Sequence, residues 1–345
     1  MKQQTEKKVT IKCIAEELGI SFSTVAKSLT GDPKIKKETR ELVTTKAKEM
    51  GYSINMLARG LRTSSMKTIA VIFNDIENPV LTYIFKTISI FMAKYGYTTL
   101  FADSQFDATT EKSLIRSVLS RLPDFVVIAP ATTDKQNVKI LLSSIKNVIV
   151  LDSIPEDSDR HFVDVDYKYG GYISACNLLS NGHRDILVIT EPLIYPYSTY
   201  YRDGINKAFD EYGIDFDDSC LRFAHSSLES ACNIVLDLWD KDNKKFRVPL
   251  TAVMCFSDNF ALGVYKAASL LGLSIPADIS VIGFDNNDIC EFTSPPLTTV
   301  HLPKERMAQV CIEIMESILV RRDEKEFRFS LAPHFVERNS VRRKS

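Results

Sequence analysis

The 345-residue sequence lacks paired cysteines, long hydrophobic runs and a net charge of either sign. Its seven cysteines are scattered singly, without a Cys-x-x-Cys pair, which predicts reduced thiols in a cytoplasmic protein. Its five histidines never fall within helical reach of one another, so we expect no metal site. The longest apolar runs have the length of a strand, which predicts no membrane-spanning helix, and residues 1–8 do not resemble a secretory signal.

The formal net charge of −1 hides an uneven distribution of charge. Residues 1–62 hold 13 basic against 7 acidic residues, whereas residues 63–345 hold 30 basic against 37 acidic residues. An asymmetry of this kind predicts a basic head, suited to nucleic acid, on an acidic body.

From residue 68 onward, continuous apolar segments of strand length alternate with amphipathic helical segments. This alternation predicts an α/β body with two similar doubly wound parallel-sheet lobes, both faces of each sheet being covered by helices. The expected strands are 68–74, 97–102, 125–129, 148–151, 186–190, 221–223, 251–256 and 279–283. The expected helices are 81–95, 109–120, 134–144, 167–181, 200–212, 228–240 and 259–271. Ligands bind beyond the carboxyl ends of such strands, so we expect a small-molecule site between the lobes.

The first 30 residues have the spacing of a helix-turn-helix. Ala15 is small enough for two helices to approach, Gly19 permits a tight turn, and Val25 anchors the second helix. Ser21 is a suitable N-cap for that second helix. An ordinary helical hairpin is the alternative, but the basic charge of this region favours DNA binding.

The sequence resembles the lactose/galactose repressor family over nearly its whole length. The resemblance lies in residues 9–29, in 37–63 and in four later segments, 180–186, 258–263, 280–285 and 295–300. It implies a helix-turn-helix head over residues 1–54, a hinge helix and linker over 55–66, and a body like the type I periplasmic binding proteins over 67–345. We assign residues 67–165 and 297–322 to the first lobe of the body, and 166–296 and 323–345 to the second.

The resemblance implies a homodimer that binds double-stranded operator DNA. By position, the side chains facing base edges in the major groove would be Phe22, Ser23 and Lys27, and those contacting phosphates would be Ser21, Thr24 and Asn55. Lys27 stands where the family more often has arginine, which forms a bidentate contact that lysine cannot form.

The hinge segment implies contacts in the minor groove. Ala58 is small enough for close approach, and Leu61 lies where the family inserts a leucine between base pairs. A flexible interdomain linker is the alternative for this segment. No leucine heptad follows the last lobe, so we expect a dimer and not a tetramer.

The resemblance also implies an effector, most simply a carbohydrate, held by carboxylates and an arginine. The candidate residues are Asp152, Asp166, Arg202, His225, Ser257, Asp258 and Asp285. The family usually has an arginine three residues before Gly204, where this chain has Tyr201, and Lys304 stands where some members have a phenylalanine. These two departures leave a nucleobase, a sugar phosphate or a protein co-regulator open as effectors.

We therefore expect a ligand-controlled transcription regulator, most simply a repressor, without cofactors or catalytic residues. The alternative is a solute-binding protein of a transport system, which would not bind DNA. A third class, an enzyme, finds no support because no phosphate-binding loop, Gly-x-Gly-x-x-Gly motif or nucleophile elbow is present.

Overall fold

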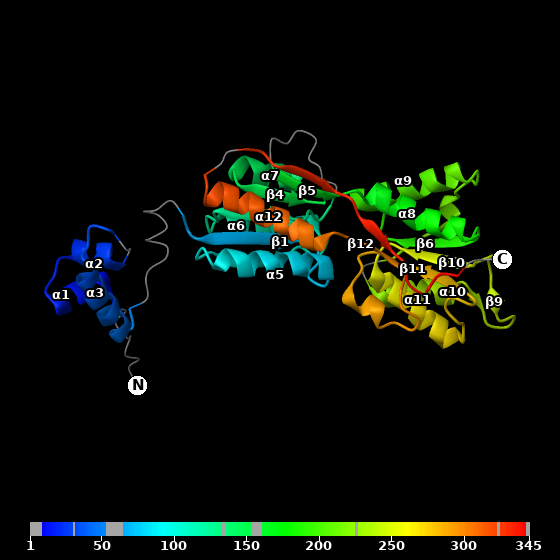
Figure 1. Cartoon of the computed structure of the whole chain (residues 1–345), viewed down its shortest axis with the longest axis horizontal. Coiled ribbons are helices and arrows are strands. Elements are labelled where there is room, and N and C mark those ends of the chain that lie inside the picture. The colour runs from blue at the N-terminus through cyan, green and yellow to red at the C-terminus, as the bar shows by residue number, and fades with distance from the viewer. Residues whose placement is uncertain are drawn as a thin grey trace. The chain divides into compact units, whose positions relative to one another are not determined.

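The chain consists of two structural units, Met1–Met66 and Lys67–Ser345, and each is considered by itself. A computed structural model describes residues 9–29, 32–52, 65–132, 136–152, 161–224, 227–322 and 325–342. Figure 1 labels the helices and strands of both units.

The first unit contains the head, in which three helices enclose a small core. These helices are α1 (Ile11–Leu18), α2 (Phe22–Leu29) and α3 (Lys37–Glu49). Gly19 ends α1 with a φ of 64°, in the left-handed region that glycine adopts without strain. The buried apolar core draws on all three helices and consists of Ile14, Ala15, Val25, Val43 and Ala47. The spacing of a small residue, a glycine and a branched apolar residue thus marks two packed helices, as the sequence predicts.

The first lobe of the body is a six-stranded parallel sheet in the order β13-β5-β4-β3-β1-β2. In β1, which lies between β3 and β2, Val71 is opposite both Phe101 and Val127. The strands are β1 (Thr68–Phe73), β2 (Thr98–Asp103), β3 (Phe125–Ile128), β4 (Val148–Leu151), β5 (His161–Val165) and β13 (Arg328–Leu331).

Helices cover both faces of this sheet (Figure 1). Alternate strand residues face α5 (Pro79–Ala93) and α12 (Lys304–Leu319) on one side. The others face α6 (Ala108–Leu119) and α7 (Gln136–Ser144) on the opposite side. Burial on both faces explains why these strands are continuous apolar runs in the sequence.

The second lobe is a four-stranded parallel sheet in the order β11-β10-β6-β7. Its strands are β6 (Ile186–Thr190), β7 (Leu221–Phe223), β10 (Ala252–Cys255) and β11 (Ser280–Ile282). Its helices are α8 (Tyr167–Ser180), α9 (Pro196–Glu211), α10 (Leu228–Asp237) and α11 (Asp258–Leu271), and short 3-10 turns span Asp218–Cys220 and Asp288–Glu291.

Helices α8 and α9 approach each other closely because glycines lie at their contact. A Cβ on Gly204 would lie 1.8 Å from the backbone oxygen of Lys168, and one on Gly171 would lie 2.1 Å from that of Tyr201. Both positions therefore exclude any side chain.

One helix of the second lobe ends earlier than the sequence predicts. The helix expected over 228–240 ends at Asp237, and Trp239–Asp240 (β8) pairs with Lys245–Phe246 (β9) instead. The Asp240 carboxylate accepts hydrogen bonds from the backbone N–H groups of Asp242 and Asn243, which stabilises this turn in place of the helix.

The assignment of all residues 323–345 to the second lobe is wrong for part of that segment. Strand β13 pairs with β5 and so belongs to the first lobe, since its backbone completes the edge of that sheet. The chain then crosses back through β14 (His334–Val336), which pairs with β12 (Thr299–His301), and Ser340 joins the second lobe by hydrogen bonds to Val281.

Candidate functional site

Helix α2 presents a polar and aromatic face at the surface of the head. Phe22, Ser23 and Lys27 are exposed on this helix, whereas Val25 is fully buried. Phe22 is 58% exposed, so its ring is available for contact with a partner.

The two residues predicted to contact phosphates are held at the start of α2. The hydroxyl of Ser21 accepts a hydrogen bond from the Thr24 N–H at 3.1 Å, and the two hydroxyl groups lie 2.8 Å apart. This cap fixes the first turn of α2, where backbone N–H groups are free to face an anion. The other residues predicted to contact DNA, Asn55, Ala58 and Leu61, lie outside the described residues, as does the effector candidate His225.

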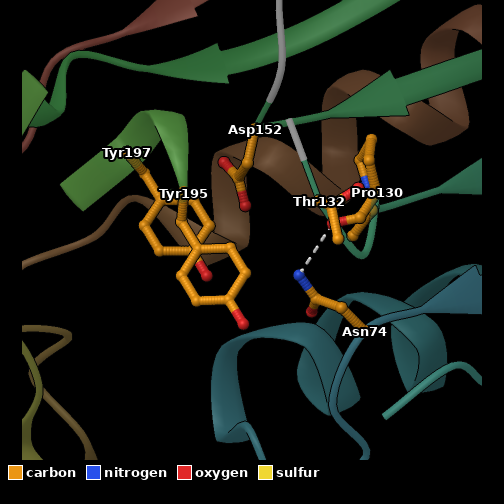
Figure 2. Close-up of a pocket in the computed structure, with 7 residues that line it drawn as sticks. Asn74, Pro130, Thr132, Asp152, Tyr195 and Tyr197 are labelled. Atoms are coloured by element: carbon orange, nitrogen blue, oxygen red, sulfur yellow. Dashed lines mark hydrogen bonds between the residues drawn. The ribbon is translucent and has the colours of Figure 1, made fainter. Parts of the chain in front are cut away.

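A small pocket lies between the two lobes of the body (Figure 2). The first lobe contributes residues that follow its strands, and the second lobe contributes the segment that leads into α9. The lining residues are Asn74, Ala129, Pro130, Thr132, Asp152, Tyr195 and Tyr197. The pocket thus lies beyond the carboxyl ends of the first-lobe strands, where the sequence predicts a ligand.

Asp152 is the one predicted effector residue that lines this pocket. It follows β4 with a φ of 52°, and its N–H donates to the Val163 oxygen at 3.1 Å. Burial, with the nearby carboxylate of Asp164, raises the pKa of Asp152 to about 7, although a hydrogen bond with the Tyr167 side chain opposes this shift.

Aromatic rings form a continuous stack beside the pocket. The rings of Tyr195 and Tyr197 are 5.5 Å apart and within 7° of parallel, and Tyr197 stacks on Phe256 at 5.6 Å. Phe256 stacks in turn on Phe284 at 5.4 Å. Phe106 of the first lobe contacts Tyr195 at 5.3 Å, so aromatic contact joins the two lobes at this edge.

Asp285 lies in the segment that leaves the second lobe after β11. Its φ of 110° is strained for a residue with a side chain, and its N–H donates to the Val300 oxygen at 2.8 Å. Burial and the neighbouring carboxylate of Asp258 raise the pKa of Asp285 well above its ordinary value.

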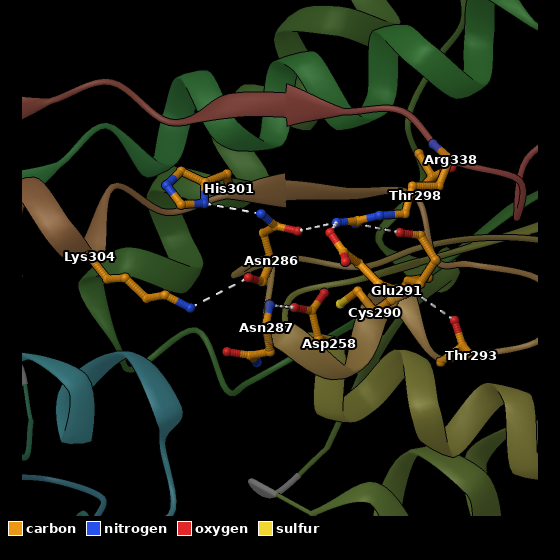
Figure 3. Close-up of polar contacts among 11 residues, drawn as sticks. Asp258, Asn286, Asn287, Cys290, Glu291, Thr293, Thr298, His301, Lys304 and Arg338 are labelled. Carbon is orange, nitrogen blue, oxygen red and sulfur yellow. Dashed lines mark hydrogen bonds and ion pairs between the residues drawn. The ribbon is translucent and has the colours of Figure 1, made fainter.

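Asp258 is fully buried and has partners within the protein (Figure 3). Its carboxylate accepts a hydrogen bond from the Asn287 N–H at 2.7 Å and one from the Thr299 hydroxyl at 2.6 Å. Burial raises the pKa of Asp258 to about 6, against the effect of these two bonds. Asp258 therefore links α11 to the segment that follows β11 and to β12.

The other predicted effector residues have structural partners and do not line the pocket. Asp166 caps α8 by accepting from the Tyr169 N–H at 2.8 Å, and Ser257 caps α11 by accepting from the Phe260 N–H at 3.2 Å. Arg202 forms an ion pair with Asp218 at 3.6 Å. The structure thus does not bring these three side chains together with Asp152.

Tyr201, at the place of the expected arginine, is fully buried among the aromatic rings. It packs edge-on against Phe256 at 4.8 Å and against Phe284 at 5.3 Å. The position three residues before Gly204 therefore holds a buried aromatic residue of the second lobe's core.

Sequence reasoning missed four polar or aromatic residues of the pocket, which are Asn74, Thr132, Tyr195 and Tyr197. Asn74 directly follows a buried apolar strand, as Asp152 does, and its side-chain N–H group donates to the Pro130 oxygen at 3.1 Å. A polar residue at the carboxyl end of a parallel strand was the available signal. The Tyr195-Pro196-Tyr197 sequence carried no comparable signal.

Within the described ranges, no helix is long and apolar enough to cross a membrane. Among the same residues, no three histidine, cysteine, aspartate or glutamate side chains are grouped so that they could hold a metal ion.

Two family models match this chain. Residues 10–55 match the bacterial regulatory proteins of the lacI family, and residues 175–341 match the periplasmic binding protein-like domain. The helices of the head and most of the second lobe thus fall within these matches.

Known proteins are similar to this chain along most of its length. The HTH-type transcriptional repressor PurR of Proteus mirabilis (strain HI4320) is 28% identical over 335 residues, which cover 96% of each chain. A lacI-family transcriptional regulator from Enterococcus faecium, solved with bound ribose, is 26% identical with a TM-score of 0.69, over 81% of this chain and all of that one. The lac repressor dimer, solved with operator and the anti-inducer ONPF, is 21% identical with a TM-score of 0.82, over 97% and 100% of the two chains.

Proposed function

We propose that this chain, which matches the lacI family of bacterial regulatory proteins over residues 10–55, represses transcription by binding an operator under the control of a small effector. The observation that carries the proposal is the exposed face of α2, which lies inside the matched residues 10–55 and displays an aromatic and a basic side chain. A solute-binding protein of a transport system has no use for such a head. The described pocket also offers no arrangement of a nucleophile and a base, so we propose a regulator and not an enzyme. Its DNA partner implies a cytoplasmic location.

We propose that α2 enters the major groove. Phe22 makes apolar contact with a thymine methyl group or stacks on a base edge, while Ser23 and Lys27 donate hydrogen bonds. Ser21 and Thr24, held together at the start of α2, contact phosphates with Asn55. Ala58 and Leu61 contact the minor groove.

We propose that two copies of the chain bind together. The solved lac repressor with the same fold is a dimer on its operator. A two-fold dimer presents two heads to a near-palindromic site, with half-sites about one helical turn or a multiple apart.

We propose that the effector binds in the pocket between the lobes, where it contacts Asp152. Asp285, strained and buried at the crossing segment, is the second residue we assign to effector binding. Effector binding changes the relative stability of two lobe arrangements and so changes the operator affinity of the dimer. The related regulator from Enterococcus faecium was solved with ribose, so a carbohydrate is one class of effector to test.

The test is selection of DNA fragments by the full chain, followed by affinity measurement on the enriched duplex. Phe22→Ala is expected to weaken binding about tenfold or more, because one apolar base contact is lost. Leu42→Ala is the matched control, since Leu42 is 54% exposed on α3 of the same head. Equal affinity of Phe22→Ala and Leu42→Ala for the enriched duplex would refute the assignment of α2.

A further inference from the structure

The described lining of the pocket between the lobes holds one acidic side chain and no basic one. Among its seven described residues, Asp152 alone is ionisable below neutral pH, and no lysine, arginine or histidine is present. The apolar part of the lining comes from Ala129 and Pro130. An anionic ligand would therefore find no counter-charge on this wall.

Asp152 has an oxygen without a partner. Its Oδ1 atom is buried, and no hydrogen-bond donor in the described part of the chain reaches it. An unsatisfied carboxylate oxygen costs about 1–3 kcal/mol or more when buried, so a donor group of a ligand that reached this atom would remove that cost. Figure 2 shows the carboxylate directed toward the rings of Tyr195 and Tyr197.

These two rings form an aromatic border beside Asp152. They lie nearly parallel at 5.5 Å, and Phe256 stacks on the other side of Tyr197 at 5.6 Å, so Tyr197 offers a ligand its edge and not its face. Tyr197 also donates to the Glu191 carboxylate at 2.6 Å, which adds another acidic group at this side.

The surroundings strengthen the negative field. Burial and the Asp164 carboxylate raise the pKa of Asp152, and burial with the carboxylates of Asp258, Glu191 and Asp152 raises the pKa of Asp285. Lys304 is the basic group that acts on Asp285; its Nζ donates to the Asn286 oxygen at 3.5 Å (Figure 3), and it is not among the described lining residues of the pocket. The place of the family's arginine holds the buried Tyr201, and Arg202 is paired with Asp218.

We propose that the effector carries an organic cation, a protonated amine on a ring-shaped body, with Asp152 as its counter-charge and the stacked Tyr195 and Tyr197 side chains at its border. This proposal rests on the effector role of the pocket stated above. The amine donates to Oδ1 of Asp152, while the ring of the ligand covers the apolar wall.

The test compares three probes of one shape and different charge, which are benzylamine, benzyl alcohol and benzoate. Dissociation constants for the full-length chain are measured by saturation-transfer NMR at pH 8, where Asp152 is largely ionised. Benzylamine is expected to bind about tenfold or more tighter than benzyl alcohol, and benzoate least, because the amine adds an ion pair with Asp152.

Asp152→Asn keeps the shape of the side chain and removes its charge, so it is expected to reduce the preference for benzylamine to about twofold or less. Asp164→Asn is the matched control, because Asp164 is a buried carboxylate of the same lobe outside the lining. Its preference for the amine is expected to persist.

The proposal fails if benzoate binds as tightly as benzylamine, if none of the three probes binds, or if Asp152→Asn retains the full preference. In each of these cases the wild-type chain can still bind its selected duplex, so the regulator function stands. Loss of that duplex binding by the wild type would refute the regulator function, whatever the order of the probes.

Discussion

In the head, Phe22, Ser23 and Lys27 lie at the surface over a core of five buried apolar side chains, whereas in the body Asp152 and Asp285 lie between two large lobes. The charged groups of the two regions therefore lie in opposite environments: those of the head are exposed to solvent, and those of the body are buried. Exposed cations attract phosphate at long range and are screened by salt. Buried carboxylates have raised pKa values and act at contact distance. DNA binding should respond mainly to ionic strength, and the pocket mainly to pH.

The largest expected effect separates the stability of the body from that of the head. Gly204→Ala places a Cβ 1.8 Å from the Lys168 oxygen, so α8 and α9 must move apart. We expect a loss of about 3 kcal/mol or more in the unfolding free energy of the body, measured by urea denaturation with circular dichroism. Asp210→Ala, an exposed change on the same helix, is the control. An unchanged denaturation midpoint for Gly204→Ala would contradict the close approach of the two helices.

The next effect is a pH dependence in the body. The pKa of Asp152 is raised to about 7 in the folded state, so folding favours its protonated form. Its ionisation therefore costs stability, and the cost grows as pH rises from about 4 to 7. Asp152→Asn should raise the unfolding free energy by about 3 kcal/mol at pH 8 and by little at pH 4.

Asp107 provides the opposite case within the same lobe. Its carboxylate caps α6, and the hydrogen bond from Thr110 lowers its pKa. Its contribution to the unfolding free energy is present above the pKa that Asp107 has in the unfolded chain. That contribution is lost as pH falls through the lower pKa of the folded state. Asp107→Asn should therefore not gain stability at pH 8. A parallel response of the two variants to pH would contradict the assigned environments.

A smaller change tests the head. Val25→Ala opens a cavity in a core of only five buried apolar residues, with an expected cost of about 2 kcal/mol to the head. Hydrogen exchange in α1 and α3 should accelerate and operator affinity should fall, while benzylamine binding stays unchanged. Val248→Ala, a partly exposed change in the body, is the control. Slow exchange in α1 and α3 of Val25→Ala would show that Val25 does not hold the head together.

The smallest effect concerns base recognition. Lys27→Arg supplies a bidentate donor for guanine, so we expect about a tenfold gain for a duplex with guanine at the contacted position, or about 1.4 kcal/mol. Replacing that guanine should abolish the gain. Anisotropy titrations on both duplexes distinguish a base contact from a phosphate contact, which would give the same gain on both.

Local patterns predicted much of the fold. The positions of Ala15, Gly19 and Val25 report a helix-turn-helix because they specify contact and turn within 11 residues. The first strand of each lobe was found because a strand buried on both faces is uniformly apolar. Strand β13 was missed because its residues alternate between half-buried and exposed, and its pairing with β5 joins segments far apart in the chain.

The pocket was less predictable. A carboxylate or hydroxyl group that follows a strand can cap a helix or bind a ligand. The sequence around Asp166 and that around Ser257 are each compatible with both roles, and the structure shows that both residues cap helices. Asp152 differs because its buried Oδ1 atom has no hydrogen-bond partner among the described residues. Tyr195 and Tyr197 face the pocket only because the two lobes meet, which no local pattern encodes.

The most direct test of the account is the salt dependence of operator binding by the full chain. A dimer that contacts six or more phosphates should lose about a thousandfold or more in affinity for its selected duplex between 50 and 200 mM salt. It should also bind that duplex at least about a thousandfold tighter than a scrambled duplex at one salt concentration. Affinity that is independent of salt, or equal for both duplexes, would contradict sequence-specific DNA binding by this chain.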